Sequence, residues 1–281
     1  MQFGICVATK IDDWQLIQYA EELGYDRAWI PDSQMIWSDC YTTLALAAQH
    51  TSRIQIGTGV AIPGTRIAPV TAHSIASINR LAPGRVFLGI GTGHTAMRVM
   101  GMQPMRIRDF REYLRVVKTL LRGEEVAYTY NDTTRTIRFL HQDLHFLNLA
   151  DPIPMIVAAN GPRALKTAGE FGDGWVAGVK PGPDAFLGDW QQVQVGAEQA
   201  GRTLPDSFHT AAFTTAVVLQ PGEPLTSDRV IEMCGSQVAA IIHFVYEIYQ
   251  QTGQEEVIPA GYRGIWDEYC AHVERMETPA D

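Results

Sequence analysis

The 281-residue sequence predicts an α/β barrel of the TIM type. Short apolar runs alternate with helical stretches over residues 1–220, a pattern typical of parallel strands that are covered by helices. Roughly seven strand–helix units fit into this length. Four such units could also form an open doubly wound sheet, but about seven units favour closure into a barrel.

The first part of the chain contains four predicted strand–helix units. The strands are short runs rich in apolar residues, and the helices repeat apolar residues at helical spacing. We expect strands at 3–8, 27–33, 53–60 and 84–93. We expect helices at 14–25, 42–51, 68–82 and 109–123. Gly24 and Gly123 end the first and last of these helices, since glycine is the usual residue just after a helix.

Residues 125–147 interrupt this order and predict an inserted hairpin, because they switch to period two around an Asn-Asp-Thr-Thr turn. The strand–helix order then resumes. We expect strands at 154–160, 173–179 and 209–220, and helices at 161–172 and 183–201. Beyond Gln220 the sequence predicts helices and no clear eighth strand. We therefore expect one domain over 1–281, with a barrel that is incomplete or irregular at its C-terminal end.

The composition favours small-molecule partners. The net charge of −9 argues against nucleic-acid and anionic-membrane surfaces, because both partners require clustered Lys and Arg. The first residues lack the basic flank and apolar stretch of a signal peptide, and no run approaches the length of a membrane span. Cys6, Cys40, Cys234 and Cys270 form no CxxC pair. These features predict a reduced, cytoplasmic protein.

Signatures of several other chemistries are missing from the sequence. No GxSxG elbow, P-loop or kinase signature occurs. His141 and His145 have a helical spacing, but they lie in the predicted hairpin without an HExxH glutamate, so we predict no metal site. The GIGTG segment at 89–93 follows a strand but does not complete the dinucleotide fingerprint.

Small residues follow most of the predicted strands, at the end of a TIM barrel where active sites are built. Small side chains let the backbone approach a flat ring or a phosphate closely. The candidate cofactor-binding residues are Thr58, Gly59, Val60, Gly91, Thr92, Gly93, His94, Ala158, Ala159, Asn160, Gly161, Pro162, Arg163, Ala177, Gly178 and Val179. Residues 160–163 begin a helix, where free N–H groups and a cation could hold a phosphate. The alternative is that Gly161 and Pro162 only start the helix and Arg163 is solvated.

Four segments in the same order resemble a known family, the luciferase-like oxidoreductases that use a flavin or the deazaflavin F420. The segments are 20–34, 42–93, 111–126 and 154–179. The similarity is strongest to the members that are like methylenetetrahydromethanopterin reductase. The resemblance implies a barrel of the bacterial luciferase-like kind and a homodimer.

The resemblance also implies roles for individual residues. It places a non-proline cis peptide at Gly59–Val60, which would back one face of the cofactor ring. It assigns ring or tail contacts to Asp32, Thr58, Gly93 and His94, and phosphate contacts to Asn160, Gly161 and Gly178. The candidate catalytic residues, which would polarise the substrate or the ring carbonyls, are Asp32, Ser33 and His94.

Two departures from the family pattern concern these candidates. Ser33 stands where related F420-dependent sugar and alcohol dehydrogenases have a catalytic His, which disfavours alcohol oxidation. His94 and Thr95 stand where reductase-like sequences tend to have an acidic residue and Ser. The loops near 34–40, 94–106 and 125–150, which should select the substrate, match no substrate-specific pattern.

Three functions remain open from the sequence. The leading hypothesis is an F420-dependent oxidoreductase that transfers hydride between the deazaflavin C5 and a small organic substrate. The second is an FMN-dependent monooxygenase that uses reduced flavin and oxygen in a dry pocket. The third is a non-catalytic flavin-binding protein, which the short C-terminal part and the missing acid–base pair suggest. F420 and FMN share a ring shape and a phosphate-bearing tail, so both cofactors fit the sequence.

Overall fold

The computed structural model describes residues 1–8, 10–178 and 182–277. Contacts divide the chain into two compact units, Met1–Phe213 and Thr214–Asp281, and we describe each unit by itself. That both units form one domain stays a prediction from the sequence.

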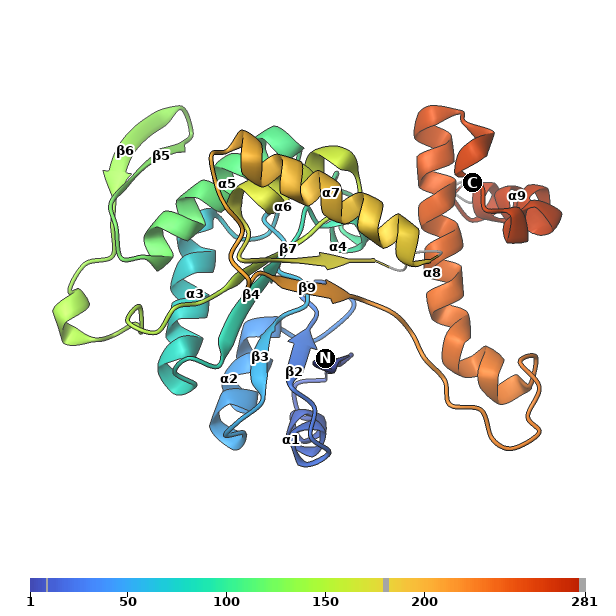
Figure 1. The fold of residues 1–281 in the computed structure, drawn as a ribbon, viewed down its shortest axis with the longest axis horizontal. Helices are drawn as coiled ribbons and strands as arrows, with labels where there is room; N and C mark the ends of the chain where they lie inside the picture. The colour runs from blue at the N-terminus through green and yellow to red at the C-terminus, as the bar shows by residue number, and fades with distance from the viewer. Residues whose placement is uncertain (9, 179–181, 278–281) are drawn as a thin grey trace. The chain divides into compact units, whose positions relative to one another are not determined.

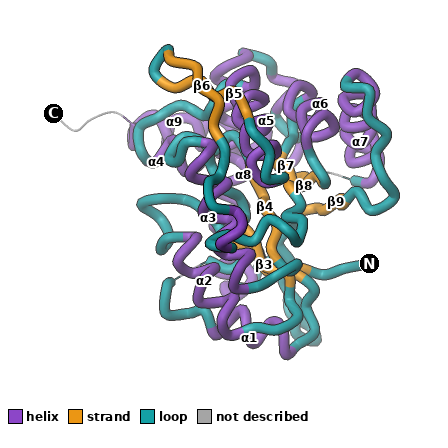
Figure 2. Tube along the Cα trace, turned by 90° about the vertical axis from the view of Figure 1, so that its left-hand side faces the viewer, coloured by secondary structure: helices purple, strands orange, loops and turns teal. Residues whose placement is uncertain are grey.

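Seven parallel strands form the sheet of the first unit, and helices surround it on the outside (Figures 1 and 2). In their order across the sheet, the strands are β1 (Gly4–Cys6), β2 (Arg27–Ile30), β3 (Gln55–Thr58), β4 (Val86–Ile90), β7 (Met155–Ala158), β8 (Gly174–Ala177) and β9 (His209–Ala212). The helices of this unit are α1 (Gln15–Glu22), α2 (Cys40–His50), α3 (Ala68–Leu81), α4 (His94–Val99), α5 (Ile107–Leu121), α6 (Pro162–Phe171) and α7 (Pro183–Gln199).

The strands follow one another across the sheet in chain order, without the reversal that marks a doubly wound fold. This order agrees with the TIM-type barrel that the sequence predicts. Among the described residues, β1 pairs only with β2 and β9 pairs only with β8. The sheet is therefore an incomplete barrel of seven strands, open between its first and last strand.

Two segments differ from the sequence prediction. The strand expected over 209–220 ends at Ala212, and among the described residues its pairs with β8 run from Gly174 to Ala177. The segment 94–99, expected as a loop, forms the short helix α4. Gly93 turns the chain into this helix with a φ of 87°, and the helix buries Ala96 and Met97 against Ile62.

The predicted insert contains a hairpin, as expected. Strands β5 (Val126–Tyr130) and β6 (Thr133–Ile137) pair in antiparallel fashion and form a separate two-stranded sheet. Asn131 and Asp132 join them with φ values of 47° and 60°. A two-residue turn of type I′ requires positive φ at both positions, which Asn and Asp tolerate. The remainder of the insert holds only a short 3₁₀ helix, η1 (Gln142–Leu144).

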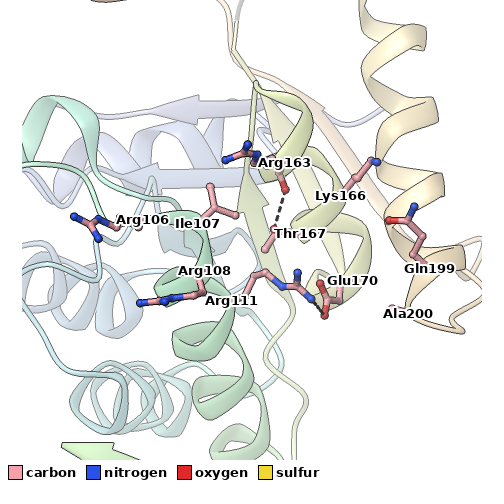
Figure 3. Close-up of a pocket in the computed structure, with 11 residues that line it drawn as sticks. Arg106, Ile107, Arg108, Arg111, Arg163, Lys166, Thr167, Glu170, Gln199 and Ala200 are labelled. Carbon is pink, nitrogen blue, oxygen red and sulfur yellow. Dashed lines mark hydrogen bonds and ion pairs between the residues drawn. The ribbon is translucent and has the colours of Figure 1, made fainter. Parts of the chain in front are cut away.

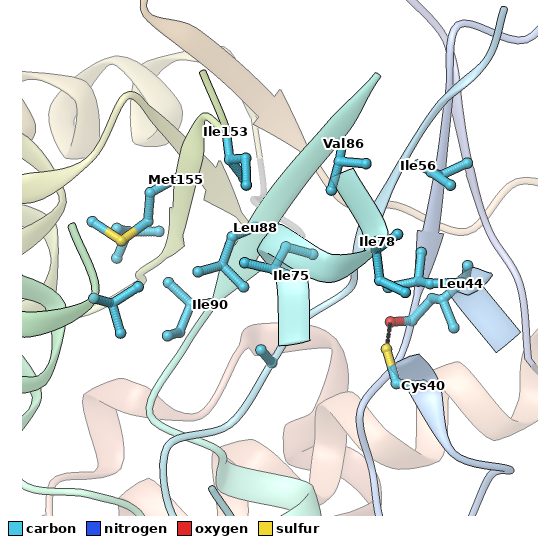
Figure 4. Packing of buried hydrophobic residues seen from close by; sticks show 14 of the residues in the cluster. Cys40, Leu44, Ile56, Ile75, Ile78, Val86, Leu88, Ile90, Ile153 and Met155 are labelled. Atoms are coloured by element: carbon cyan, nitrogen blue, oxygen red, sulfur yellow. Dashed lines mark hydrogen bonds between the residues drawn. The ribbon is translucent and has the colours of Figure 1, made fainter. Parts of the chain in front are cut away.

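The two faces of the central strands are packed differently. Val86, Leu88 and Ile90 of β4 are buried beside Ile75 and Ile78 of α3, as Figure 4 shows. This contact of strand and helix forms the main core of the unit. Its apolar residues come from every other position of β4, as the alternation of side chains along a strand requires.

Aromatic rings and glycines share the opposite face. A Cβ on Gly57 would overlap the ring of Phe87, and a Cβ on Gly89 would lie 2.8 Å from the indole of Trp29. The rings of Trp29 and Phe87 contact each other edge to face, with centroids 4.4 Å apart. The rings therefore fill the space that these glycines leave beneath the strand ends.

The second unit is helical. It contains α8 (Asp228–Thr252), two short 3₁₀ helices, η2 (Glu255–Val257) and η3 (Ala260–Ile265), and α9 (Trp266–Glu277). Its core consists of apolar residues from these helices and the segment that joins them. They are Ile242, Val245, Tyr246, Ile258, Trp266 and Val273. Within the described part of the chain, no helix is long and apolar enough to cross a membrane.

His209 at the start of β9 should make folding pH-dependent. Burial and the nearby Arg27 lower the pKa of His209 to about 4 from 6.5. In the unfolded chain this imidazole gains its proton near pH 6.5, whereas in the folded protein it does so only near pH 4. Its contribution to stability is therefore full above pH 6.5 and is lost as the pH falls to about 4. Allowing for its partial exposure, we expect a loss of about 2 kcal/mol across this window.

Urea unfolding at a series of pH values checks this expectation. His209→Gln removes the titrating group, so its free energy of unfolding should fall less than that of the unchanged protein between pH 7 and pH 4. Parallel curves for the two proteins would show that His209 makes no such contribution.

Candidate functional site

The carboxyl ends of β2, β3 and β4 are joined by backbone hydrogen bonds around a bulge. Gly59 N–H donates to Ile30 O over 2.6 Å, and Ala61 N–H donates to Gly89 O over 2.8 Å. Between them, the Gly59–Val60 peptide is cis, as the resemblance implies. The Thr58 hydroxyl is buried and donates to Gly89 O over 2.5 Å, so it is held within the sheet.

Gly91 at the end of β4 lies between two neighbouring strand ends. A Cβ on Gly91 would be 3.2 Å from both the Val60 side chain and the Ala158 side chain. A larger residue at this position would push one of these side chains aside. The structure thus brings together Val60, Gly91 and Ala158, three of the candidate cofactor-binding residues.

Asp32, just after β2, lies beneath this bulge in a buried ionic network. Its side chain is 1% exposed and forms an ion pair with Arg66, whose Nη1 lies 2.9 Å from both carboxylate oxygens. Gln34 Nε2 donates to Asp32 Oδ1 over 2.6 Å, and Ile62 N–H donates weakly to Oδ2 over 3.4 Å. Burial raises the pKa of Asp32, while Arg66 limits the increase. Asp32 therefore links the bulge to the loop that carries Arg66.

Arg66 extends the network towards α2 and α5. Its Nη2 lies 2.9 Å from Asp39 Oδ2, and its guanidinium stacks 4.5 Å above the ring of Tyr41. Its carbonyl oxygen accepts a hydrogen bond from Tyr113 over 2.8 Å. Sequence reasoning singled out Asp32 but missed Arg66 and its partners Asp39 and Tyr41. The available signal was a charged residue in a largely apolar stretch that follows a predicted strand.

Two buried polar atoms of this network are orphaned. Gln34 Oε1 and Tyr41 Oη have no hydrogen-bond partner among the described residues. Buried polar atoms are normally paired, so an unpaired one calls for a ligand or a water molecule. These two atoms fit a polar group that would bind beside Asp32.

The start of α6 has the features expected of an anion site. Asn160 Oδ1 accepts a hydrogen bond from Gly178 N–H over 3.0 Å, which ties the ends of β7 and β8 together. Gly161 is the N-cap of α6, has no side-chain cap, and has open space around its Cβ position. Within the described ranges, no side chain caps the first-turn N–H groups. Arg163 in this turn is exposed to solvent.

The remaining predicted residues lie around these centres. Ser33 is partly buried, and its carbonyl accepts from the N–H groups of Ile36 and Trp37. His94 is exposed at the first position of α4, directly after Gly93. Thr92 is partly buried, Ala159 and Ala177 are buried, and Pro162 is exposed at the start of α6. Val179 lies outside the described residues.

Glycine-rich strand ends, a bulge at the end of β3 and an open helix N-terminus together form a surface suited to a ring with an anionic tail. The family model of luciferase-like monooxygenase matches residues 4–242 of the chain. The chain belongs to this family. The resemblance drawn from its sequence segments is thereby confirmed.

Two relatives resemble the chain at moderate identity. It is 33% identical over 220 residues to 5,10-methylenetetrahydromethanopterin reductase of Methanolobus tindarius, covering 76% of this chain and 64% of that protein. It is 35% identical over 215 residues to F420-dependent hydroxymycolic acid dehydrogenase of Mycobacterium tuberculosis, covering 72% and 57% of the two chains.

A solved luciferase-like structure agrees with these relatives. The coenzyme F420 dependent tetrahydromethanopterin reductase from Methanopyrus kandleri superposes with a TM-score of 0.62 at 29% identity, covering 76% of this chain and 65% of that one. The chain spans less than two thirds of the length of each of these three proteins.

Proposed function

We propose that this luciferase-like chain is an F420-dependent oxidoreductase that acts on a small organic substrate. The observation that carries the proposal is the juxtaposition of the bulge at Gly59–Val60 with Gly91 and Ala158 at the strand ends. Relatives whose names specify F420 support the choice of cofactor. When bound, F420 supplies a hydride donor or acceptor at its C5.

The residues of the site fit such a cofactor. Val60, Gly91 and Ala158 would hold the ring, because they offer small side chains and backbone at one place. Asn160, Gly161 and the first turn of α6 would hold the phosphate. The orphaned atoms Gln34 Oε1 and Tyr41 Oη offer polar contacts near Asp32 that the protein itself does not use.

The three candidate catalytic residues have different surroundings. Asp32 is engaged with Arg66, Gln34 and Ile62, so we assign it a positioning role in which it fixes the bulge. Ser33 and His94 remain the candidates for contact with the substrate or the ring carbonyls, since both lie at strand ends and retain solvent access.

Further properties belong to the same proposal. The net charge of −9 supports small molecules as partners and disfavours nucleic acid and anionic membrane. A homodimer follows from the family resemblance. Four free cysteines among the described residues agree with a cytoplasmic location, where thiols stay reduced.

Equilibrium binding of the full chain to F420 and to FMN, followed by cofactor fluorescence, tests the proposal. Tight binding of F420 with weak binding of FMN is expected. Preference for FMN, together with oxygen consumption in the presence of reduced FMN, would instead establish the monooxygenase. Binding of either cofactor without turnover of any substrate would point to a non-catalytic binding protein.

A carboxylate introduced at the start of α6 should weaken cofactor binding without lowering the stability of the protein. Gly161→Asp places an N-cap residue in open space, so we expect the free energy of unfolding to stay constant or rise by up to about 1 kcal/mol. The same carboxylate would occupy and repel the phosphate, and F420 affinity should fall at least about tenfold. Fluorescence titration and urea unfolding measure the two effects.

The matched control is Gly182→Asp. Gly182 is the N-cap of α7, also has open space around its Cβ position, and lies outside the proposed cofactor contacts. This variant should bind F420 like the unchanged protein. Equal affinities for the Gly161→Asp and Gly182→Asp proteins would remove α6 from the cofactor site.

A further inference from the structure

A basic pocket, separate from the strand ends described above, lies on the outside of the first unit between α5, α6 and α7 (Figure 3). It has a volume of about 840 Å³, which lies within the range of small-molecule sites. Five cationic side chains and a single carboxylate line it. These residues are Arg106, Arg108, Arg111, Arg163, Lys166 and Glu170.

The clustering of positive charge is unusual for this chain. Acidic residues outnumber basic ones by 31 to 22, yet five of the basic residues line this one pocket. Like charges that share a pocket repel one another, and the repulsion is relieved by an anion between them. The charge distribution therefore indicates an anionic ligand.

Only part of this positive charge is neutralised by the protein. Arg111 forms an ion pair with Glu170 over 2.6 Å, and Arg108 lies 3.2 Å from the neighbouring Asp109. In the described part of the chain, the side chains of Arg106, Arg163 and Lys166 have no hydrogen bond or ion pair with another residue. These three cations remain available for a ligand.

The walls of the pocket are held by close helix packing. A Cβ on Gly196 of α7 would overlap the backbone of Lys166 in α6, so the two helices are in backbone contact. The Arg111–Glu170 pair joins α5 to α6 across another side. The backbone positions that carry these cations are therefore fixed at the start of α5 and within α6.

We propose that this pocket binds a polyanion of the phosphate or carboxylate class. Arg106 immediately precedes α5, and Arg163 lies in the first turn of α6, where helix dipoles also favour negative charge. Guanidinium groups bind both phosphate and carboxylate through paired hydrogen bonds. Such an anion can come from the tail of a bound cofactor that extends past the start of α6, or from a separate small molecule.

Calorimetric titration of the cofactor-free full chain with sodium tripolyphosphate at low ionic strength tests the site. We expect binding that weakens as salt is added. Arg106→Gln combined with Lys166→Gln should weaken it at least about tenfold, because two charge-assisted contacts are lost. The same double variant should not lower the thermal stability of the ligand-free protein, since both side chains lack partners within the described residues.

The matched control combines Arg80→Gln with Arg135→Gln, two exposed arginines of the first unit outside the pocket. It removes the same charge and should leave tripolyphosphate affinity within about twofold. Absence of binding to the unchanged protein, or equal weakening in both double variants, would overturn the proposal.

Repeating the titration with F420-saturated protein identifies the source of the anion. Loss of tripolyphosphate binding would assign the pocket to the cofactor tail, and unchanged binding would assign it to a separate ligand. Both results require that the pocket binds anions. If the protein failed to bind F420, the titration of the cofactor-free protein with tripolyphosphate would still test the anion pocket, so the pocket and the F420-dependent function can be refuted separately.

Discussion

Asp32→Asn is expected to lower the free energy of unfolding by about 3 kcal/mol or more. The substitution removes the charge that pairs with Arg66, whose side chain is only 17% exposed. Breaking a buried pair from one side is costly because Arg66 would then keep only its pair with the half-exposed Asp39 and would lose the buried carboxylate that offsets its desolvation. Urea unfolding followed by circular dichroism measures the loss.

Asp32→Asn should also weaken cofactor binding. Asp32 accepts from Ile62 N–H, which follows the Gly59–Val60 bulge. Loosening this contact should weaken F420 binding in Asp32→Asn even at temperatures where the variant is folded. The weakening would identify Asp32 as a positioning residue for the bulge.

Asp39→Asn is the matched control, because Asp39 also pairs with Arg66 but is 47% exposed. Its carboxylate caps α2 by accepting from Thr42 N–H, and Asn caps helices as well as Asp. We expect a loss below about 1 kcal/mol. If both variants lost the same stability, the burial of Asp32 could not be the source of its effect.

Gly169→Ala is expected to cost about 3 kcal/mol, although alanine favours helices over glycine. Gly169 lies in α6 where the helix touches α7. A Cβ there would overlap the carbonyl oxygen of Val193 and lie 2.8 Å from Ala197 N. Because the neighbours are backbone atoms, the helices would have to separate, and thermal unfolding should shift to lower temperature.

Gly188→Ala makes the same chemical change within α7, with open space around the new methyl group. It should therefore stabilise the protein by about 0.5 to 1 kcal/mol through helix propensity alone. A loss of stability in this variant, or none in Gly169→Ala, would contradict the close packing of α6 against α7. The same packing supports the wall of the basic pocket.

Local patterns in the sequence predicted much of the fold. The period of the apolar residues located the strands and helices of the first unit, and Asn131-Asp132 marked the hairpin turn. The strand prediction over 209–220 was wrong after Ala212, although its residues favour β structure. A strand exists only where a neighbour supplies hydrogen bonds, and propensity does not report whether that neighbour is present.

The sequence by itself determined the unit order, the small residues at the strand ends and the family, because each depends on residues close together in the chain or on ordered segments. Only the tertiary structure decided that Arg66 pairs with Asp32, 34 positions away, and that Arg106, Arg163 and Lys166 share one pocket. Such contacts form when the curled sheet and packed helices bring distant side chains together. No local periodicity encodes that distance, so charged residues that look alike in sequence become a buried pair in one place and an open anion site in another.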